Sequence, residues 1–200
     1  MYRFALDYLM DWTSRTSRKP LVVRGARQVG KSHLVRMLAA QAFEGLLEIN
    51  LETDDNVASL FESREPARIV EFLGARYGTE VRPGKTLLFL DEIQAAPELF
   101  ACLRYFFEKM PELHVVAAGS LLDFALKDHS FSMPVGRIEY LHLGPMNFEE
   151  FLLALGKNQL RDFVRGFLPG AEVPEALHGE LMRQVKQFLV VGGMPASVKA

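Results

Sequence analysis

Gly25-Ala26-Arg27-Gln28-Val29-Gly30-Lys31-Ser32 is the stretch that decides the fold of this chain, because it follows the pattern G-x-x-x-x-G-K-[ST]. An apolar run, 21–23, precedes it and an amphipathic stretch follows it, an order that predicts a strand, a phosphate loop and a helix. The glycines let backbone N–H groups surround a polyphosphate, Lys31 can reach the outer phosphates, and the Ser32 hydroxyl can bind Mg²⁺. The alternative is an ordinary glycine-containing turn that matches by chance. We predict that the whole stretch binds a nucleoside triphosphate.

A second motif follows the apolar run 86–90, which Pro83-Gly84 precedes and Asp91-Glu92 follows. Such a run predicts a buried parallel strand, and open α/β sheets bind ligands at the carboxyl ends of their strands. Asp91 can then hold the Mg²⁺, while Glu92 can orient and activate the attacking water. The alternative is a solvated acidic turn. Beside a phosphate loop, the acidic pair favours hydrolysis over binding alone.

Composition indicates a soluble globular protein, with 49% hydrophobic residues in a chain of 200 and a net charge of -2. This charge gives no general attraction to nucleic acid or to anionic membranes. One basic cluster, Arg15, Arg18 and Lys19, is expected to be a solvated loop near the nucleotide, with a DNA contact as the weaker alternative. The single cysteine, Cys102, predicts a core thiol in a reducing compartment. No apolar run approaches membrane-spanning length, so we expect a cytoplasmic protein without membrane contact.

Periodicity along the chain predicts alternating strands and helices. Residues 46–51 alternate between apolar and polar side chains, which is typical of an edge strand. The other expected elements are an opening helix over 5–12, helices within 56–77 broken at Pro66, a helix over 97–110, and strands at 113–118 and 138–143.

The character of the sequence changes after Pro145, where helical patterns replace strands. We interpret 1–145 as a nucleotide-binding α/β domain and 146–200 as a truncated helical lid. The chain stops five residues after Pro195 without a recognisable finish, so we expect it to be the amino-terminal part of a longer protein.

Five blocks in order resemble one group of P-loop proteins. They are "KPLVVRGARQVGKS", "TLLFLDEIQAAPELFACLRYFFE", "VVAAGSLL", "MPVGRIEYLHLGPMNFEEFL" and "VVGGMP". This group is the AAA-plus-like, signal-transduction branch of bacterial and archaeal ATPases, in which a winged helix and a restriction-endonuclease-like domain follow the ATPase domain. The resemblance implies an α/β fold, the P-loop NTPase three-layer sandwich, with a parallel five-stranded sheet of order 5-1-4-3-2 and a helical lid.

The resemblance also implies roles for residues outside the two motifs. Ser120 would be a sensor that hydrogen-bonds the γ-phosphate or the attacking water; its alternative is an N-cap for a helix starting at Leu121. Arg137 matches an arginine before the last core strand, which could stabilise the transferring phosphoryl group in its own chain or across a subunit boundary, or else form a salt bridge. Gly193 and Pro195 match a Gly-x-Pro turn that approaches the base and ribose; a plain helix stop is the alternative.

These observations leave two main hypotheses for function. The first is a Mg²⁺-dependent ATPase in which nucleotide state moves the lid. The second is a slow nucleotide-gated switch that works through a partner or an attached domain. A small-molecule kinase fits poorly, because an acidic pair suits water activation and no acceptor pocket is evident.

The preference for adenine rests on the resemblance, as does the expectation of a homo-oligomer or of a DNA or protein partner bound through a missing carboxyl-terminal region. No residue aligns with a nuclease site.

Overall fold

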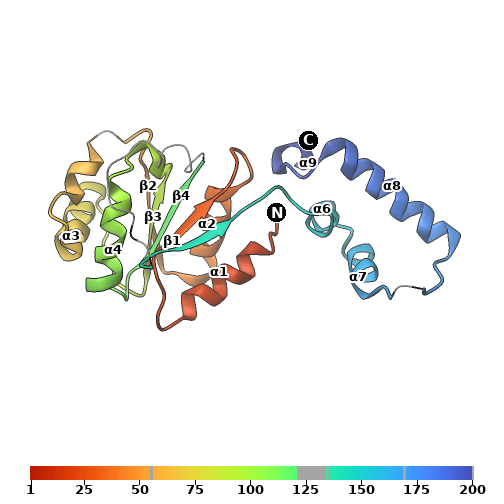
Figure 1. The fold of residues 1–200 in the computed structure, drawn as a ribbon, viewed down its shortest axis with the longest axis horizontal. Helices are drawn as coiled ribbons and strands as arrows, with labels where there is room; N and C mark the ends of the chain where they lie inside the picture. Colours follow the sequence, from red (N-terminus) through yellow and green to blue (C-terminus); the bar gives the residue numbers. More distant parts are fainter. Residues whose placement is uncertain (55, 121–133, 135, 169, 200) are drawn as a thin grey trace. The chain divides into compact units, whose positions relative to one another are not determined.

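A parallel five-stranded sheet forms the centre of the computed structural model, which describes all of residues 1–200 except 55, 121–133, 135, 169 and 200 (Figure 1). Its strand order is β2-β3-β4-β1-β5, which confirms the predicted order of 5-1-4-3-2. The strands are β1 (Leu21–Arg24), β2 (Gly45–Asn50), β3 (Thr86–Asp91), β4 (His114–Gly119) and β5 (Glu139–His142). The inner strands β3 and β4 are buried at every position, whereas β2 is buried only at alternate positions near its end. The alternation seen in the sequence therefore marks an edge strand.

Helices cover both faces of this sheet. Figure 1 shows α3 and α4 on one side and α1 and α2 on the other, which makes three layers. The helices of these layers are α1 (Ala5–Ser14), α2 (Lys31–Ala42), α3 (Pro66–Tyr77) and α4 (Leu99–Lys109), with short 3₁₀ turns η1 (Val57–Phe61) and η2 (Ile93–Ala95). Alternate strand residues face the two helical layers, because successive side chains of a strand point to opposite faces. Thus Leu88, Leu90 and Val115 pack with Leu103 and Phe106 of α4 in one buried core.

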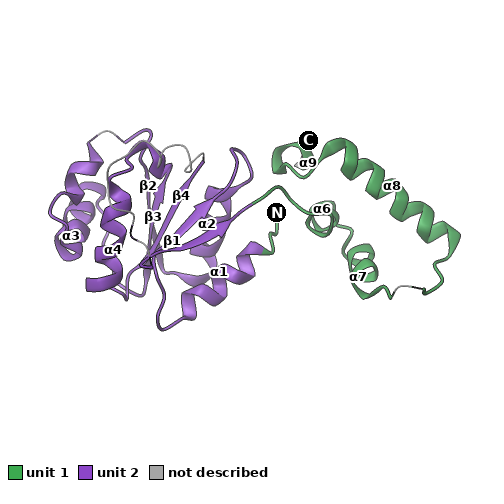
Figure 2. Ribbon diagram, viewed as in Figure 1, with its two compact units in different colours: residues 1–4, 144–200 green, residues 5–143 purple. Residues whose placement is uncertain are grey.

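The chain divides into two compact units, 5–143 and a smaller one formed by 1–4 with 144–200 (Figure 2). The smaller unit is helical, with α6 (Phe148–Ala154), α7 (Asn158–Gly166), α8 (Glu175–Val191) and α9 (Pro195–Lys199). None of the described helices is long and apolar enough to cross a membrane.

Buried polar contacts hold the first residues of the chain to the smaller unit. Asn147 and Glu150 form a capping box at the start of α6, in which each side chain accepts from the other residue's backbone N–H. The second oxygen of Glu150 accepts from Arg3 Nε at 3.1 Å and from the Phe4 N–H at 2.7 Å. Arg3 also donates to the Gly144 carbonyl at 2.7 Å, so residues 1–4 belong with 144–200.

Candidate functional site

The loop between β1 and α2 has a backbone that only its glycines allow. A Cβ on Gly25 would lie 2.1 Å from the Leu143 carbonyl oxygen, so a side chain there would displace the end of β5. Gly30 (φ 94) has a left-handed conformation and leads directly into α2 without any side-chain cap. No side chain therefore caps α2 at Gly30, and this end of the helix suits an anion.

Lys31 lies inside this loop. Its side chain is buried, and Nζ donates to the carbonyl oxygens of Gly25 at 3.1 Å and Ala26 at 3.0 Å. Burial is the main cause that lowers the pKa of Lys31. The ammonium group is thus held across the loop by two neutral acceptors, and phosphate oxygens are stronger acceptors for it.

Ser32 and Asp91 meet although they come from different motifs. Ser32 Oγ donates to Asp91 Oδ2 at 2.6 Å, and the Glu92 N–H donates to Oδ1 at 3.0 Å. Burial raises the pKa of Asp91, which is 4% exposed, and the two hydrogen bonds counteract this only in part. A hydroxyl and a carboxylate are hard oxygen ligands that fit Mg²⁺. Among the described residues no group of three or more acidic, His or Cys side chains could hold a metal, so nucleotide and water oxygens would have to complete the shell of Mg²⁺.

Glu92 has a strained backbone directly after β3. Its φ of 53 and ψ of 46 are left-handed, which is rare for a residue with a side chain and is concentrated at functional sites. Gln94 Nε2 donates to Glu92 Oε2 at 2.5 Å. The strained turn thus directly follows the strand, and an amide two residues later holds one oxygen of the Glu92 carboxylate.

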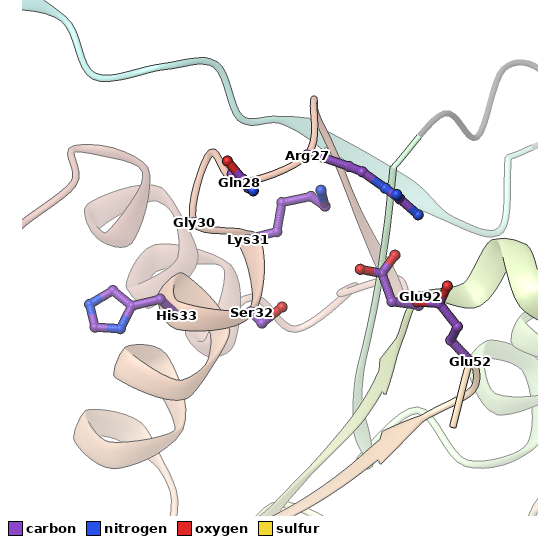
Figure 3. A pocket seen from close by; sticks show the side chains of 8 residues that line it. All are labelled: Arg27, Gln28, Gly30, Lys31, Ser32, His33, Glu52 and Glu92. Atoms are coloured by element: carbon purple, nitrogen blue, oxygen red, sulfur yellow. The ribbon is translucent and has the colours of Figure 1, made fainter. Parts of the chain in front are cut away.

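These side chains line a cavity of about 460 Å³ in the larger unit (Figure 3). Its lining residues are Arg27, Gln28, Gly30, Lys31, Ser32, His33, Glu52 and Glu92. Sequence reasoning missed two of them, His33 and Glu52. His33 directly follows the motif on α2, and Glu52 follows β2, whose last residue, Asn50, pairs with Asp91 of β3. The register of an edge strand beside the acidic motif was the signal that could have identified Glu52.

Ser120 is placed where the resemblance implies, at the carboxyl end of β4. It is buried, and β4 lies between β1 and β3, which carry the two motifs. It does not line the cavity, so its sensor role stays a prediction. The alternative as an N-cap concerns a helix that begins at Leu121, outside the described residues.

Arg137 lies at the amino ends of the strands, opposite the carboxyl ends where the phosphate loop lies. It precedes Glu139, which pairs with Leu21 at the start of β1, whereas the loop follows the end of β1. Its Nε lies 3.0 Å from Glu108 Oε1, and its side chain is 52% exposed. The salt-bridge interpretation describes this arrangement, and an action of Arg137 on the phosphate of its own chain does not fit it. The role across a subunit boundary stays a prediction.

The basic cluster lies at the amino ends of the strands, as Arg137 does, so its expected place near the nucleotide is wrong. Arg15 binds Asp11 at 2.8 Å and Glu139 at 3.1 Å, and Arg18 donates to the Pro111 carbonyl at 2.7 Å. The cluster precedes β1, and the start of a parallel strand is remote from its carboxyl end. Its charges serve contacts within the fold.

Gly193 and Pro195 lie between α8 and α9 in the smaller unit. A Cβ on Gly193 would lie 2.1 Å from the Met146 carbonyl oxygen, and the Met146 N–H donates to the Gly193 carbonyl at 2.7 Å. α8 ends just before this turn, and Pro195 begins α9, so the turn does act as a helix stop. Its role toward base and ribose stays a prediction.

Comparisons with known proteins agree with this fold. A family model described as "AAA domain" matches residues 17–152. DnaA from Aquifex aeolicus, solved with AMPPCP bound, is similar with a TM-score of 0.54 and 16% identity, over 98% of this chain and 58% of that chain. Drosophila ORC bound to DNA is similar with a TM-score of 0.51 and 20% identity, over 80% of this chain and 47% of that chain. The chain thus spans about half the length of these structures, and at such identities the likeness concerns the fold alone. No curated protein matches the sequence.

Proposed function

The chain belongs to the AAA domain family, and from this premise we propose that it binds ATP with Mg²⁺ and hydrolyses the nucleotide to ADP and phosphate. The contact between Ser32 and Asp91 carries the proposal, because it joins a hydroxyl of the phosphate loop to a buried carboxylate of β3 at 2.6 Å. Elsewhere such a carboxylate would be an unfavourable residue in a core strand. Beside the N-terminus of α2, where Gly30 provides no side-chain cap, it supplies what a metal–triphosphate complex needs.

Each residue of the loop has a distinct task in this proposal. The backbone from Gly25 to Gly30 surrounds the phosphates, and Lys31 exchanges its two carbonyl acceptors for phosphate oxygens. Ser32 and Asp91 would hold Mg²⁺, which neutralises charge on the β- and γ-phosphates when bound.

Glu92 is the proposed base. It lines the cavity from a strained turn, and among the described residues only one of its carboxylate oxygens, the one that Gln94 binds, has a hydrogen bond. A carboxylate in this position can accept a proton from water as the water attacks the γ-phosphorus. The likeness to AMPPCP-bound DnaA supports a nucleotide in such a fold but does not address this step.

The experiment is phosphate release from ATP by the full-length protein and by Glu92→Gln. The amide keeps the size of the side chain but cannot act as a base, so turnover should fall about 10²-fold or more while ATP still binds. Glu98→Gln is the matched control, because Glu98 is exposed and lies outside the cavity, and the substitution removes the same charge. Normal turnover of Glu92→Gln would remove Glu92 from this role, and a Mg²⁺-independent wild type would contradict the proposal.

A slow nucleotide-gated switch is the second candidate, and the contact between Gln94 and Glu92 favours it. An amide that binds one carboxylate oxygen restrains the Glu92 side chain, and a base held away from the attacking water would activate it slowly. Gln94→Ala distinguishes the two candidates. Faster turnover in this variant indicates a restrained switch, and unchanged or slower turnover indicates an ordinary ATPase.

The remaining assignments from the family resemblance extend the proposal. We propose that residues 146–200 respond to the nucleotide as a lid, with Gly193 and Pro195 toward base and ribose, and that Ser120 senses the γ-phosphate. We also propose that the protein forms a homo-oligomer and binds a DNA or protein partner. The structure of Drosophila ORC, which is similar in fold and was solved bound to DNA, supports the DNA partner.

A further inference from the structure

Arg27 is a cation in the proposed nucleotide pocket, and no group among the described residues neutralises it. It lies on the exposed side of the phosphate loop and lines the cavity together with Lys31 and Glu92. Figure 3 shows the Arg27 side chain extended across the pocket, toward the side on which Glu92 lies. Within the described part of the chain, Arg27 makes no hydrogen bond or ion pair.

Neighbouring arginines show how unusual this is. Arg36 of α2 binds both oxygens of Glu48, at 2.8 and 2.6 Å. The guanidinium of Arg24 lies over the ring of Tyr140, 4.0 Å from its centroid. Both side chains have structural partners, so the fold itself accounts for their positions. For Arg27 no partner among the described residues gives such an account.

The backbone around Arg27 is fixed although its side chain is not. The next residue, Gln28, is left-handed with a φ of 65, and Val29 after it is completely buried. Gly25 is held against the Leu143 carbonyl. A rigid loop therefore aims Arg27 into the cavity at the cost of local strain, a pattern that is concentrated at functional sites.

Two positively charged side chains, Arg27 and Lys31, line the same cavity. Like charges at one site repel each other, and a polyanion between them would remove this repulsion. A triphosphate provides such an anion, with most of its charge on the terminal phosphate.

We propose that Arg27 binds the γ-phosphate in its own chain and stabilises the charge that develops during its transfer. This deepens the proposed function and rests on it. In the reaction the water oxygen bonds to the γ-phosphorus, its proton passes to Glu92, and the bond from that phosphorus to the β–γ bridging oxygen breaks. Charge then gathers on the bridging and γ-oxygens, and the guanidinium N–H groups donate to them. Arg137 cannot do this for its own chain, because it lies at the amino ends of the strands and the phosphate loop lies at their carboxyl ends.

The test compares Arg27→Ala, Arg27→Lys and Arg36→Ala in the full-length protein. Arg27→Ala should lower ATP turnover about 10²-fold or more, a conservative figure for an arginine that acts on a transferring phosphoryl group. Its affinity should fall for ATP and change little for ADP, which lacks the γ-phosphate. Arg27→Lys should recover only part of the rate, because an ammonium lacks the planar fork of donors. Arg36→Ala removes the same charge outside the cavity and should hydrolyse ATP normally.

Mixing two inactive variants distinguishes an Arg27 that acts on the nucleotide of its own chain from one that acts on the nucleotide of a neighbouring chain. Arg27→Ala mixed with Glu92→Gln should stay inactive, since each chain lacks part of its own site. Recovery on mixing would overturn the assignment to the same chain. Normal turnover of Arg27→Ala, or equal losses of ADP and ATP affinity, would overturn the contact with the γ-phosphate.

The proposed function can fail separately from this inference. If wild-type protein released no phosphate, the hydrolysis proposal would fail, and the comparison of ATP and ADP affinities would still test Arg27. Because Arg27 is exposed and without a described partner, its variants should unfold at the wild-type temperature without nucleotide. If Arg27→Ala did not, Arg27→Gln, which keeps more of the side chain, would take its place in every comparison.

Discussion

Asp91→Asn should stabilise the empty protein and abolish its response to Mg²⁺ and ATP. Asp91 is 4% exposed, and burial raises its pKa, so the charged carboxylate is less favourable in the folded chain than in the unfolded one. An acid with a raised folded pKa lowers stability at every pH above that value, including neutral pH. Asparagine is neutral and has nearly the same shape. Its oxygen can still accept from the Glu92 N–H, and its NH₂ group can donate to Ser32 Oγ.

The expected size follows from these contacts. Removing an unfavourable charge at a functional site raises the free energy of unfolding by about 0.5–2 kcal/mol. For a chain of this length each kcal/mol shifts the unfolding temperature by roughly 2–4 °C, so Asp91→Asn should unfold about 1–8 °C higher. Asp91→Ala leaves the Ser32 hydroxyl and the Glu92 N–H without their acceptor. Each such loss costs about 1–3 kcal/mol, so this variant should unfold at a lower temperature than wild type.

Thermal unfolding with and without Mg²⁺ and ATP is the assay. At a ligand concentration of about 100 times the Kd, binding stabilises the wild type by about 2.7 kcal/mol, or roughly 5–11 °C. Asp91→Asn should lose most of this shift, so the order of the two proteins reverses when ligand is added. A lower unfolding temperature for empty Asp91→Asn than for empty wild type would refute the electrostatic reasoning. If Mg²⁺ and ATP shifted Asp91→Asn by as much as they shift the wild type, the metal assignment would be refuted.

The remaining predictions concern three other side chains. Lys31→Ala should lose most of its affinity for a fluorescent ATP analogue, because it deletes the cation held inside the loop, and unchanged titration curves would contradict a phosphate site there. Arg137→Ala breaks a half-exposed ion pair with Glu108 and should lower the free energy of unfolding by less than about 1 kcal/mol in urea titrations; if Arg137 serves a neighbouring copy, its hydrolysis should also fall and return on mixing with Glu92→Gln. Burial beside Trp12 and Phe43 lowers the pKa of His114, so the unfolded chain binds the proton first, and stability should decline as the pH falls below the ordinary pKa of histidine, about 6.5. Urea unfolding at about pH 7.5 and 5.5 measures this decline. If the same decline persisted in His114→Phe, other groups would be its cause.

The sequence predicts most of the sheet because local patterns encode it. The apolar run before Asp91 identifies a central strand, and the alternation in 46–51 identifies the edge strand β2. The strand order came from the family resemblance, since periodicity does not determine which strands are neighbours. Cys102 was expected in the core and is buried, where burial raises the pKa of its thiol.

Contacts between remote residues could not be predicted in this way. Arg3 and Glu150 are 147 residues apart, and no period in either segment indicates that they pair. The same holds for Arg137 with Glu108, and for Glu52, which joins the cavity because β2 ends beside β3. Side-chain partners depend on register and on loop geometry, and these emerge only when the sheet is assembled.

Arg27 and Arg137 lie at opposite ends of the strands of one parallel sheet, and this geometry constrains how hydrolysis depends on assembly. A guanidinium in the phosphate loop reaches the phosphate of its own chain, so hydrolysis through Arg27 needs no second copy. Arg137 is ion-paired with Glu108 at the amino ends of the strands. It can meet a γ-phosphate only if another chain presents its phosphate loop there. Turnover through Arg27 is therefore independent of protein concentration, whereas turnover that needs Arg137 rises as copies associate. Both arginines can contribute, in which case Arg27→Ala lowers the rate at every concentration and Arg137→Ala removes only the part that rises with association.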